Sequence, residues 1–188
     1  VFIAGIIFMS TIYNKIDITM LSALSTDEAV GYYSYAQRTV NIVLTMCSAV
    51  TAIFLPRLSY YYDNEKAVFY KLMDKGFQIL CLGVVPLAVG LFLTANQAVV
   101  LLYGDSFTPT GTTIKLMCPL ILIKGFGDLL CYQLAYSSKN EYILLPGSAI
   151  ASIINVITNS ILIPLYAQNG AVIASVMSEL TTNIIQFL

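Results

Sequence analysis

Six apolar stretches, separated by short polar breaks, run along this sequence of 188 residues. The length of each stretch is close to that of a membrane-spanning α-helix, which needs about 20 residues to cross the hydrocarbon core of a bilayer. The pattern therefore predicts six membrane-spanning helices, with approximate bounds 1–24, 32–55, 76–95, 113–138, 142–166 and 169–188.

Two of the breaks contain further structure. Pro56 is expected to end the second span, and residues 63–75 carry apolar side chains at helical spacing with lysines between them. Two interpretations of this segment stand side by side: an amphipathic helix in the membrane interface, or a plain connector. Residues 96–112 contain a short apolar run, VVLLYG, too short to span. They predict a half-buried lid or re-entrant turn.

Composition excludes the main alternatives to a membrane protein. Hydrophobic residues make up 58% of the chain and charged residues 10%, whereas a soluble domain has about 45–50% and about 25%. So few charges cannot cover a water-facing surface, and disorder needs the opposite composition. The net charge is −1 and the nine basic residues are scattered. The expected partner is thus the lipid bilayer, with no nucleic acid.

The residue types needed for catalysis or tight metal binding are scarce. The sequence has no histidine, and its four cysteines lie inside apolar runs without a CxxC pair. A serine or cysteine nucleophile would therefore lack a histidine base, and no zinc framework is expected. We predict that the chain is not an enzyme, holds no metal site and has no resident cofactor apart from a coupling proton or sodium ion.

Basic residues predict the orientation. If the breaks alternate between the two sides of the membrane, one side receives five basic residues: Arg57, Lys66, Lys71, Lys75 and Lys139. The other side receives at most Lys115. Cytoplasmic loops carry the excess of Lys and Arg, so the basic side is predicted to be cytoplasmic.

Charged residues inside the predicted spans are the first candidates for function: Asp17, Arg38, Lys124, Asp128 and Glu179. Each costs about 2.5–3.5 kcal/mol at the membrane centre, so such residues usually face a bundle interior or a wet cavity. Structural interpretations remain open beside this one. Arg38 can snorkel to the interface, and Lys124 and Asp128, four residues apart, can neutralise each other. Glu179 has no cation nearby in the sequence and is expected to be unpaired.

Amides and small residues complete the predicted interior. Asn41 lies three residues after Arg38, and Asn155 and Asn159 are four residues apart in one span. They either join helices by hydrogen bonds or line a cavity. Small residues such as Ser175 are interpreted as sites of close helix packing.

Three stretches, in this order, resemble a known family: Asn14–Val40, Phe54–Glu65 and Asn155–Glu179. They contain a membrane Asp followed by Met-Leu, an acidic loop and VGYYSYA; then PRLS after a span; then two asparagines before Ile-Pro and a Glu in the next span. This set is similar to the polysaccharide-transporter (O-antigen-type flippase) branch of the multidrug/oligosaccharidyl-lipid/polysaccharide exporter superfamily. One departure is Ile18, which stands where the family often has an Arg after the Asp.

The resemblance implies an all-α integral membrane fold, with this chain as a C-terminal six-helix lobe cut from a longer, two-lobe exporter. It implies a multi-pass protein of the bacterial or archaeal cytoplasmic membrane whose partners are an N-terminal lobe and a lipid-linked oligosaccharide. The implied activity is flipping of a polyprenyl-diphosphate-linked oligosaccharide by alternating access, for cell-surface polysaccharide biosynthesis.

On this reading the candidate residues take two roles. Arg38 and Lys124 suit the anionic diphosphate, with the asparagines Asn41, Asn155 and Asn159 as further substrate contacts. Asp17, Asp128 and Glu179 are candidates for ion coupling. The alternatives are an ion-coupled multidrug exporter of the same superfamily, a membrane-embedded glycan polymerase or ligase, and a purely structural membrane subunit.

Overall fold

The computed structural model describes residues 15–139, 142 and 144–187, apart from the side chains of Tyr132 and Leu145, and every regular element in this part is helical. A helix covers residues 15–24. It is followed by α2 (Asp27–Asn64), α3 (Lys66–Tyr103), the short η1 (Asp105–Phe107), α4 (Thr108–Gly127), the π-helical η2 (Asp128–Gln133), α5 (Leu134–Ser137), α6 (Leu144–Tyr166) and α7 (Gln168–Phe187). The predicted all-α fold is confirmed.

Three of the described helices are long and apolar enough to cross a membrane: α2, α3 and the Pro146–Tyr166 part of α6. Each of them also exposes large apolar side chains. Ile53, Leu82, Leu101 and Leu165 each expose more than 65% of their surface. Side chains of this kind are stable against lipid and costly against water.

α2 is longer than the span predicted for it. Thr26 caps its start by accepting a hydrogen bond from the Ala29 amide (3.3 Å), and Asp27 and Glu28 lie in the first turn, where the helix dipole favours acidic groups. Pro56, the predicted end of the second span, does not end the helix, because α2 runs through Pro56 to Asn64. A proline removes one hydrogen bond from a helix, and a membrane helix packed against neighbours tolerates that loss.

α3 corrects two further predictions. Residues 63–75 are neither a separate interfacial helix nor a connector, because Glu65 alone separates α2 from α3. The expected lid or re-entrant turn at 96–112 is also wrong, because α3 continues to Tyr103. α3 has 38 residues, which makes it about 57 Å long. This length is nearly twice the thickness of the hydrocarbon core, which is about 30 Å. Polar residues in it therefore mark where the helix leaves lipid, and not where it ends.

The reversal between α3 and α4 takes place at Gly104, whose φ of 85° is a conformation that glycine adopts at little cost. After it, α4, η2 and α5 form a continuous helical stretch from Thr108 to Ser137, with a π-helical turn beginning at Asp128. The helical stretch that contains the predicted fourth span, 113–138, thus begins five residues before that span and has a local change of helix type. π-helical turns inside α-helices occur frequently at functional sites.

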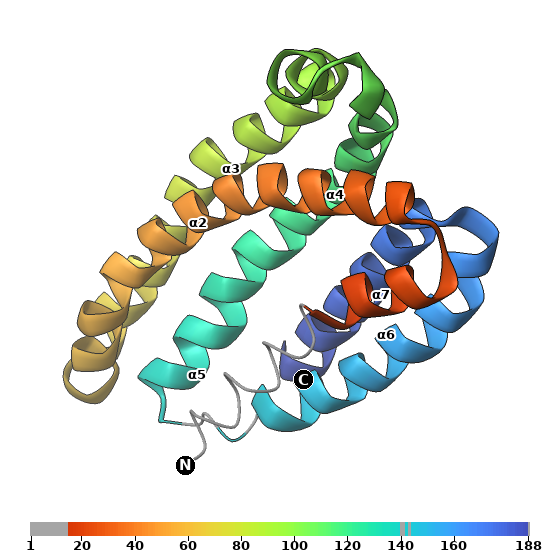
Figure 1. The fold of residues 1–188 in the computed structure, drawn as a ribbon. Helices are drawn as coiled ribbons and strands as arrows, with labels where there is room; N and C mark the ends of the chain where they lie inside the picture. The colour runs from red at the N-terminus through yellow and green to blue at the C-terminus, as the bar shows by residue number, and fades with distance from the viewer. Residues whose placement is uncertain (1–14, 140–141, 143, 188) are drawn as a thin grey trace.

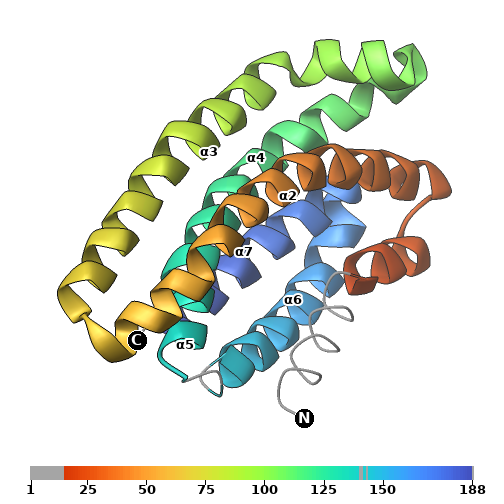
Figure 2. The ribbon, with the colours of Figure 1, turned by 90° about the vertical axis from the view of Figure 1, so that its left-hand side faces the viewer.

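The helices form two packed groups. α2, α3 and α4 pack together, α6 and α7 form a hairpin, and α4 contacts α7. Figure 1 shows the hairpin beside the long helices, and Figure 2 shows α2, α3 and α4 running along one another. The apolar core lies between α2, α3, α4 and α7, with Tyr33, Leu80, Val84, Ile114 and Ile121 at most 2% exposed.

The turn between α6 and α7 is tight. Ala167 has a φ of 47°, and Gly170 lies so close to α6 that a Cβ there would collide with the backbone carbonyl of Leu162. Only glycine permits this approach, which brings the polar positions of α6 and α7 face to face.

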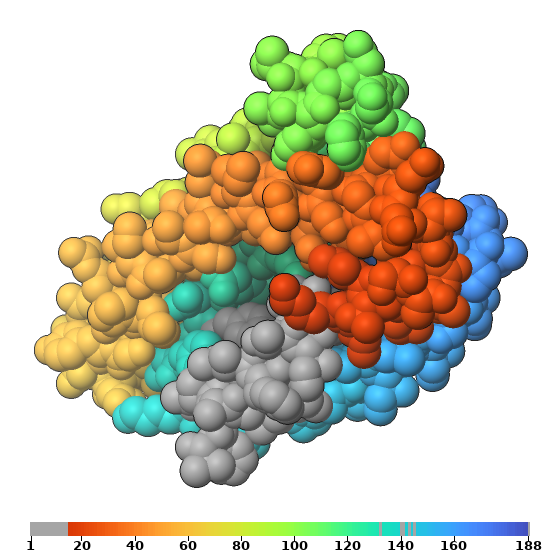
Figure 3. Space-filling view, viewed as in Figure 1, coloured from red at the N-terminus to blue at the C-terminus, as the bar shows by residue number. Residues whose placement is uncertain are grey.

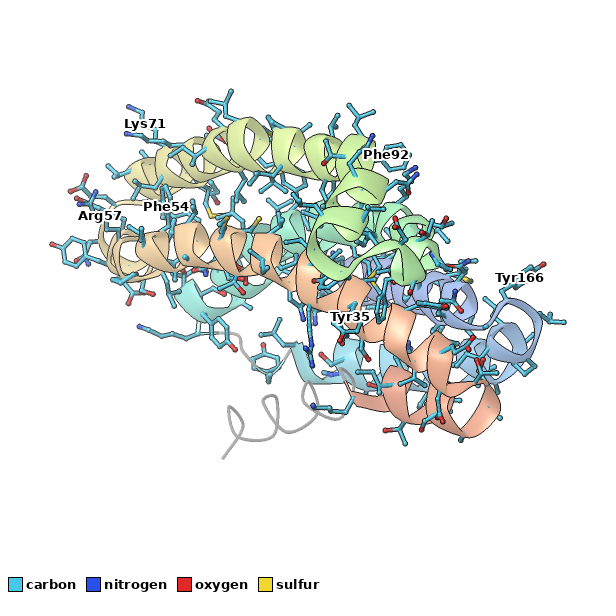
Figure 4. All side chains as sticks on the ribbon, turned by 45° about the horizontal axis from the view of Figure 1, so that its top comes forward. Tyr35, Phe54, Arg57, Lys71, Phe92 and Tyr166 are labelled. Carbon is cyan, nitrogen blue, oxygen red and sulfur yellow. The ribbon has the colours of Figure 1, made fainter. Side chains whose placement is uncertain are left out.

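Contacts join the ends of the described helices at two opposite ends of the molecule. Lys139 Nζ lies 2.6 Å from Asp63 Oδ2, which joins the turn after α5 to the end of α2. At the other end, the Tyr32 and Phe107 rings meet edge to face, and Thr113 donates to Asn169 Oδ1 (3.1 Å). Figure 4 shows Arg57 and Lys71 together at the first end and Tyr166 at the far side of the molecule.

Candidate functional site: two polar clusters and an exposed stripe

Asp17 lies at the centre of a buried hydrogen-bond network between four helices. Its side chain belongs to the helix of residues 15–24, and the residue is 3% exposed. Its Oδ2 accepts from Tyr33 Oη on α2 (2.9 Å) and from Ser175 Oγ on α7 (2.6 Å). Its Oδ1 accepts from Asn159 Nδ2 on α6 (2.7 Å). Neutral donors therefore hold this carboxyl, and the described residues include no ion pair to it.

The two asparagines of α6 extend this network. Asn159 Nδ2 also donates to Asn155 Oδ1 (3.0 Å), and Asn155 Nδ2 donates to Ser178 Oγ (3.3 Å). Both asparagines are fully buried, and Asn159 Oδ1 has no hydrogen-bond partner among the described residues. A buried carboxylate beside an unused amide oxygen supplies the oxygen ligands that a proton or a small hard cation takes.

A second cluster lies between α2, α4, η2 and α7. Lys124 Nζ is 3.5 Å from Glu179 Oε2, and Thr51 Oγ1 hydrogen-bonds to Asp128 Oδ2. Lys124, Asp128 and Glu179 line one cavity of about 180 Å³ together with Leu44, Cys47, Ser48 and Gly125. The Lys124 side chain is 29% exposed and that of Glu179 is 11% exposed. The structure thus brings Glu179 to the same cavity as Lys124 and Asp128, which lie more than 50 residues before it in the sequence.

The prediction that Glu179 is unpaired is wrong, because packing of α7 against α4 brings it to Lys124. The salt bridge of Lys124 is thus to Glu179 on another helix, whereas the partner of Asp128 is the Thr51 hydroxyl. Pairing of Lys124 with Asp128, four residues away, was one of the alternatives that helical spacing left open.

Arg38 and Asn41 lie apart from both clusters, on an exposed stripe of α2. The stripe consists of Arg38, Asn41, Thr45, Ser48 and Ala52, which follow one another at three- and four-residue spacing and are all exposed. Arg38 Cζ lies 5.5 Å from the centre of the Tyr35 ring. Ser48 belongs both to the stripe and to the wall of the Lys124 cavity. The stripe therefore leads from Arg38 to Lys124.

This stripe differs from the exposed face of α3, which carries Leu82, Val89, Phe92 and Leu93. In a membrane, exposed polar side chains face a wet interior or another protein part in preference to lipid. Figure 3 shows the face of the molecule on which α2 overhangs the deeper α4, leaving the surface hollowed between them.

The structure separates the five predicted substrate contacts into different places. Asn155 and Asn159 belong to the sealed Asp17 network, whereas Arg38 and Asn41 lie on the α2 stripe and Lys124 in the cavity at its side. A larger cavity of about 530 Å³ between α4 and α7 is lined by apolar side chains with the exception of Asn183, and contains none of the predicted residues.

Sequence reasoning missed the neutral partners of the charged residues. Ser175, interpreted as a small packing residue, donates to Asp17, and Tyr33 and Thr51 bond Asp17 and Asp128. Tyr33 is 16 residues from Asp17 and Thr51 is 77 residues from Asp128. No periodicity links such pairs. The sequence did contain one indication for Ser175: it lies one turn before Glu179, so the two side chains share a face of the same helix.

Comparison of the sequence with known proteins identifies a family. The family model described as "Polysaccharide biosynthesis protein" matches residues 2–111. Two curated relatives from Haloferax volcanii, named "Probable low-salt glycan biosynthesis flippase Agl15" and "Probable flippase AglR", are each 23% identical over 172 residues. The alignments cover 88% of this chain and 35% of each relative. The chain thus spans about a third of the length of these relatives.

The matched residues cover more than half of the chain and include the Asp17 helix, the whole α2 stripe and α3. The apolar helices make the protein a multi-pass membrane protein. The predicted resemblance to glycan transporters is confirmed: the chain belongs to the polysaccharide biosynthesis protein family.

Proposed function

We propose that the chain forms one lobe of a flippase, which moves a polyprenyl-diphosphate-linked oligosaccharide from the cytoplasmic to the outer leaflet of the cytoplasmic membrane by alternating access. A second lobe completes the transport path. The observation that carries this proposal is the α2 stripe: five small or polar exposed residues, beginning at Arg38, within a helix whose apolar side chains Ile42, Met46 and Ile53 are exposed beside them.

The stripe suits the substrate's head group by its charge and its size. Arg38 offers a planar guanidinium that binds phosphate oxygens in a bidentate manner, and its contact with Tyr35 restrains it. From Arg38 to Ser48 the helix rises about 15 Å, so the diphosphate and the first sugars fit along it. Asn41 and Thr45 supply hydrogen bonds to hydroxyl groups, and Lys124 supplies a second cation at the far end.

The Asp17 network is the proposed coupling site. A carboxylate in a sealed polar pocket can exchange a proton or sodium ion only when the helices around it move apart. Asp17 is bonded from α2, α6 and α7, so occupation of this site and the relative positions of these helices depend on each other. Such dependence is what ion-driven alternating access requires.

The stripe favours this substrate over a cationic drug. A drug exporter of the same superfamily would present carboxylates to its cargo, whereas the stripe offers a guanidinium and neutral groups, and Asp17 is sealed from it. We find no long catalytic loop in the described part that would favour a polymerase or ligase.

The direct test is glycan export in cells that depend on this protein. Replacement of Arg38 by Ala should abolish export while the protein remains inserted, and Arg38→Lys should keep a part of it. Normal export with Arg38→Ala would remove the central support for the proposal.

A further inference from the structure

Two adjoining apolar cavities follow α4. One, of about 250 Å³, lies between α3 and α4, and the other, of about 530 Å³, lies between α4 and α7. Leu122 lines both cavities, so they meet at this residue. We call the two together the α4 groove.

The periodicity of α4 places the groove on the opposite side of this helix from the Lys124 cavity. Lys124 lies nine residues after Lys115, which is about two and a half turns of an α-helix, so the two side chains leave α4 on opposite faces. The face of Lys115 continues along the groove at three- and four-residue spacing through Pro119, Leu122, Phe126 and Leu130. α4 therefore separates the groove from the Lys124 cavity and from the α2 stripe that borders that cavity.

The other walls of the groove belong to the exposed apolar surface of the protein. Val89 and Phe92 line it on α3, and Ile184 and Phe187 line it on α7; all four side chains are exposed. Figure 4 labels Phe92 on α3, far from Lys71 on the same helix. Contact of such side chains with water is costly, whereas contact with hydrocarbon is not. We therefore place the opening of the groove against lipid.

The polar residue in the wall of the larger cavity is engaged by the protein itself. Asn183 Nδ2 donates to the Ile123 carbonyl at 2.8 Å. Gly127 leaves room for this amide, because a Cβ at that position would collide with it. A hydrocarbon chain can thus lie along this wall without stripping a donor of its partner.

A single cation lines the other end of the groove. Lys115 is half-buried in the wall of the smaller cavity, and neither of the ion pairs found among the described residues involves it. It lies seven residues after Thr108, where α4 begins, so about two turns of polar helix precede it. Its ammonium group can therefore reach the membrane interface while its stem stays beside the groove. An anionic head group there would gain a charge partner, and the hydrocarbon chain attached to it would gain an apolar wall.

We propose that the α4 groove binds an anionic phospholipid of the surrounding membrane, with the phosphate at Lys115 and one hydrocarbon chain along α4 toward Phe126. The helix rises about 16 Å between these two residues, which matches the depth of one leaflet, about 15 Å. The lipid belongs to the outer leaflet if the predicted orientation holds. A chain in the groove contacts α3, α4 and α7 at once and so holds these helices together.

The position of the groove favours a membrane lipid over the transported one. Arg38 and Lys124, the proposed contacts of the transported diphosphate, lie on the other side of α4. A lipid whose head group occupied that side would have to wrap around α4 to place its chain in the groove. The inference is therefore independent of the proposed function.

The first test places a fluorescent reporter in the groove. This chain contains no tryptophan, so Phe92→Trp introduces one at the groove and Leu93→Trp introduces one at the same depth, on an exposed position that does not line it. The full protein is placed in phosphatidylcholine vesicles with a small fraction of lipid brominated on its chains, either phosphatidylglycerol or phosphatidylcholine, and the added fluorescence over the parent is measured. At position 92, brominated phosphatidylglycerol should quench as if enriched about five-fold over the neutral lipid, the preference that one lysine near a membrane surface gives. At position 93 the two lipids should quench equally. Equal quenching by both lipids at position 92 would overturn the proposal.

The second test asks whether Lys115 holds the phosphate. Lys115→Gln, added to Phe92→Trp, should remove the excess quenching by phosphatidylglycerol and keep the quenching by phosphatidylcholine. Lys75→Gln is the matched control, because it removes an exposed lysine of α3 outside the groove, and it should leave the preference unchanged. If the preference survived Lys115→Gln, the site as proposed would be rejected.

The third test identifies the source of the lipid. Polyprenyl phosphate added to the same vesicles should leave the quenching by brominated phosphatidylglycerol unchanged. Relief of the quenching by small amounts of polyprenyl phosphate would instead assign the groove to the carrier of the glycan and contradict the proposal. Arg38→Ala should show the parent's preference for phosphatidylglycerol whether or not it exports glycan, so failure of the proposed function would leave the lipid site standing.

Discussion

Ser175 and Glu179 lie one turn apart on α7, and each contacts a charged residue on another helix. Ser175 Oγ donates to Asp17 Oδ2 at 2.6 Å, and Glu179 Oε2 lies 3.5 Å from Lys124 Nζ. One helix therefore connects a sealed carboxylate network to a half-open charged cavity. Because side chains four residues apart move together on a rigid helix, a shift of α7 by part of a turn would break both contacts at once. We interpret α7 as the element that couples the two sites.

The predicted orientation can be checked by labelling from outside the cell. In a background without the native cysteines, a cysteine at position 105 should react with a membrane-impermeant thiol reagent, and one at position 66 should not. Both positions are exposed, so burial does not explain a difference. The physical basis is the excess of basic residues on the side of position 66. Reaction at 66 with protection at 105 would reverse the orientation and the direction of transport.

Arg38 is expected to bind the anionic part of the substrate. Arg38→Ala should lower glycan export to background with membrane abundance unchanged, and Arg38→Lys should retain a part of it, since the charge survives without the bidentate fork. The matched control is Arg57→Ala, which removes the same group from an exposed position of the same helix, near its other end. Equal export by the two Ala variants would reduce Arg38 to an interfacial anchor.

Asp17 is expected to stabilise the junction of four helices. Asp17→Ala removes the acceptor that Tyr33, Asn159 and Ser175 share, although Asn159 Nδ2 keeps its bond to Asn155 Oδ1 and Ser175 Oγ keeps its bond to the Ala171 carbonyl. We expect a loss of about 1–3 kcal/mol in the free energy of unfolding, the cost of disrupting a buried polar network. Asp17→Asn should cost less, because its amide keeps an acceptor and the hydroxyl groups can turn. Thermal unfolding in detergent or lipid measures both.

The same pair of variants separates stability from coupling. Asp17→Asn should leave the protein inserted but remove the dependence of export on the ion gradient, because its amide neither ionises nor binds a cation as a carboxylate does. A gradient response equal to that of the parent would exclude Asp17 as the coupling group, whatever its effect on stability.

Gly170 is expected to be indispensable for the α6–α7 hairpin. In Gly170→Ala, the added methyl group meets the Leu162 carbonyl, so the two helices must move apart, at a cost of about 1–3 kcal/mol. The control is Gly83→Ala on α3, where a Cβ meets nothing within 4 Å. That change should be neutral or stabilise the helix by up to about 1 kcal/mol. Equal unfolding temperatures for the two variants would contradict the close approach.

Much of the fold follows from the sequence because the membrane imposes a simple rule. Backbone groups in lipid must be bonded within the segment, so long apolar stretches become helices, and an all-α fold is predicted without knowledge of any contact. The same rule explains why α2 continues beyond the predicted span end at Pro56 and why the expectation for residues 96–112 was wrong. Polarity shows where a helix leaves lipid, whereas its end depends on caps and turns such as Thr26 and Gly104.

The charged residues themselves were also visible in the sequence, because an ionisable side chain among apolar residues is costly and stands out. Their partners were not. Helical spacing offered Asp128 as a possible partner of Lys124 and left Glu179 alone, but the packing of α7 on α4 joined Lys124 to Glu179. Asp17 and Asn159 are 142 residues apart, and only the tertiary arrangement brings them into contact. Sequence determined which residues need a partner, because that depends on local polarity, while the tertiary structure decided which partner each received, because helix packing acts across the whole chain.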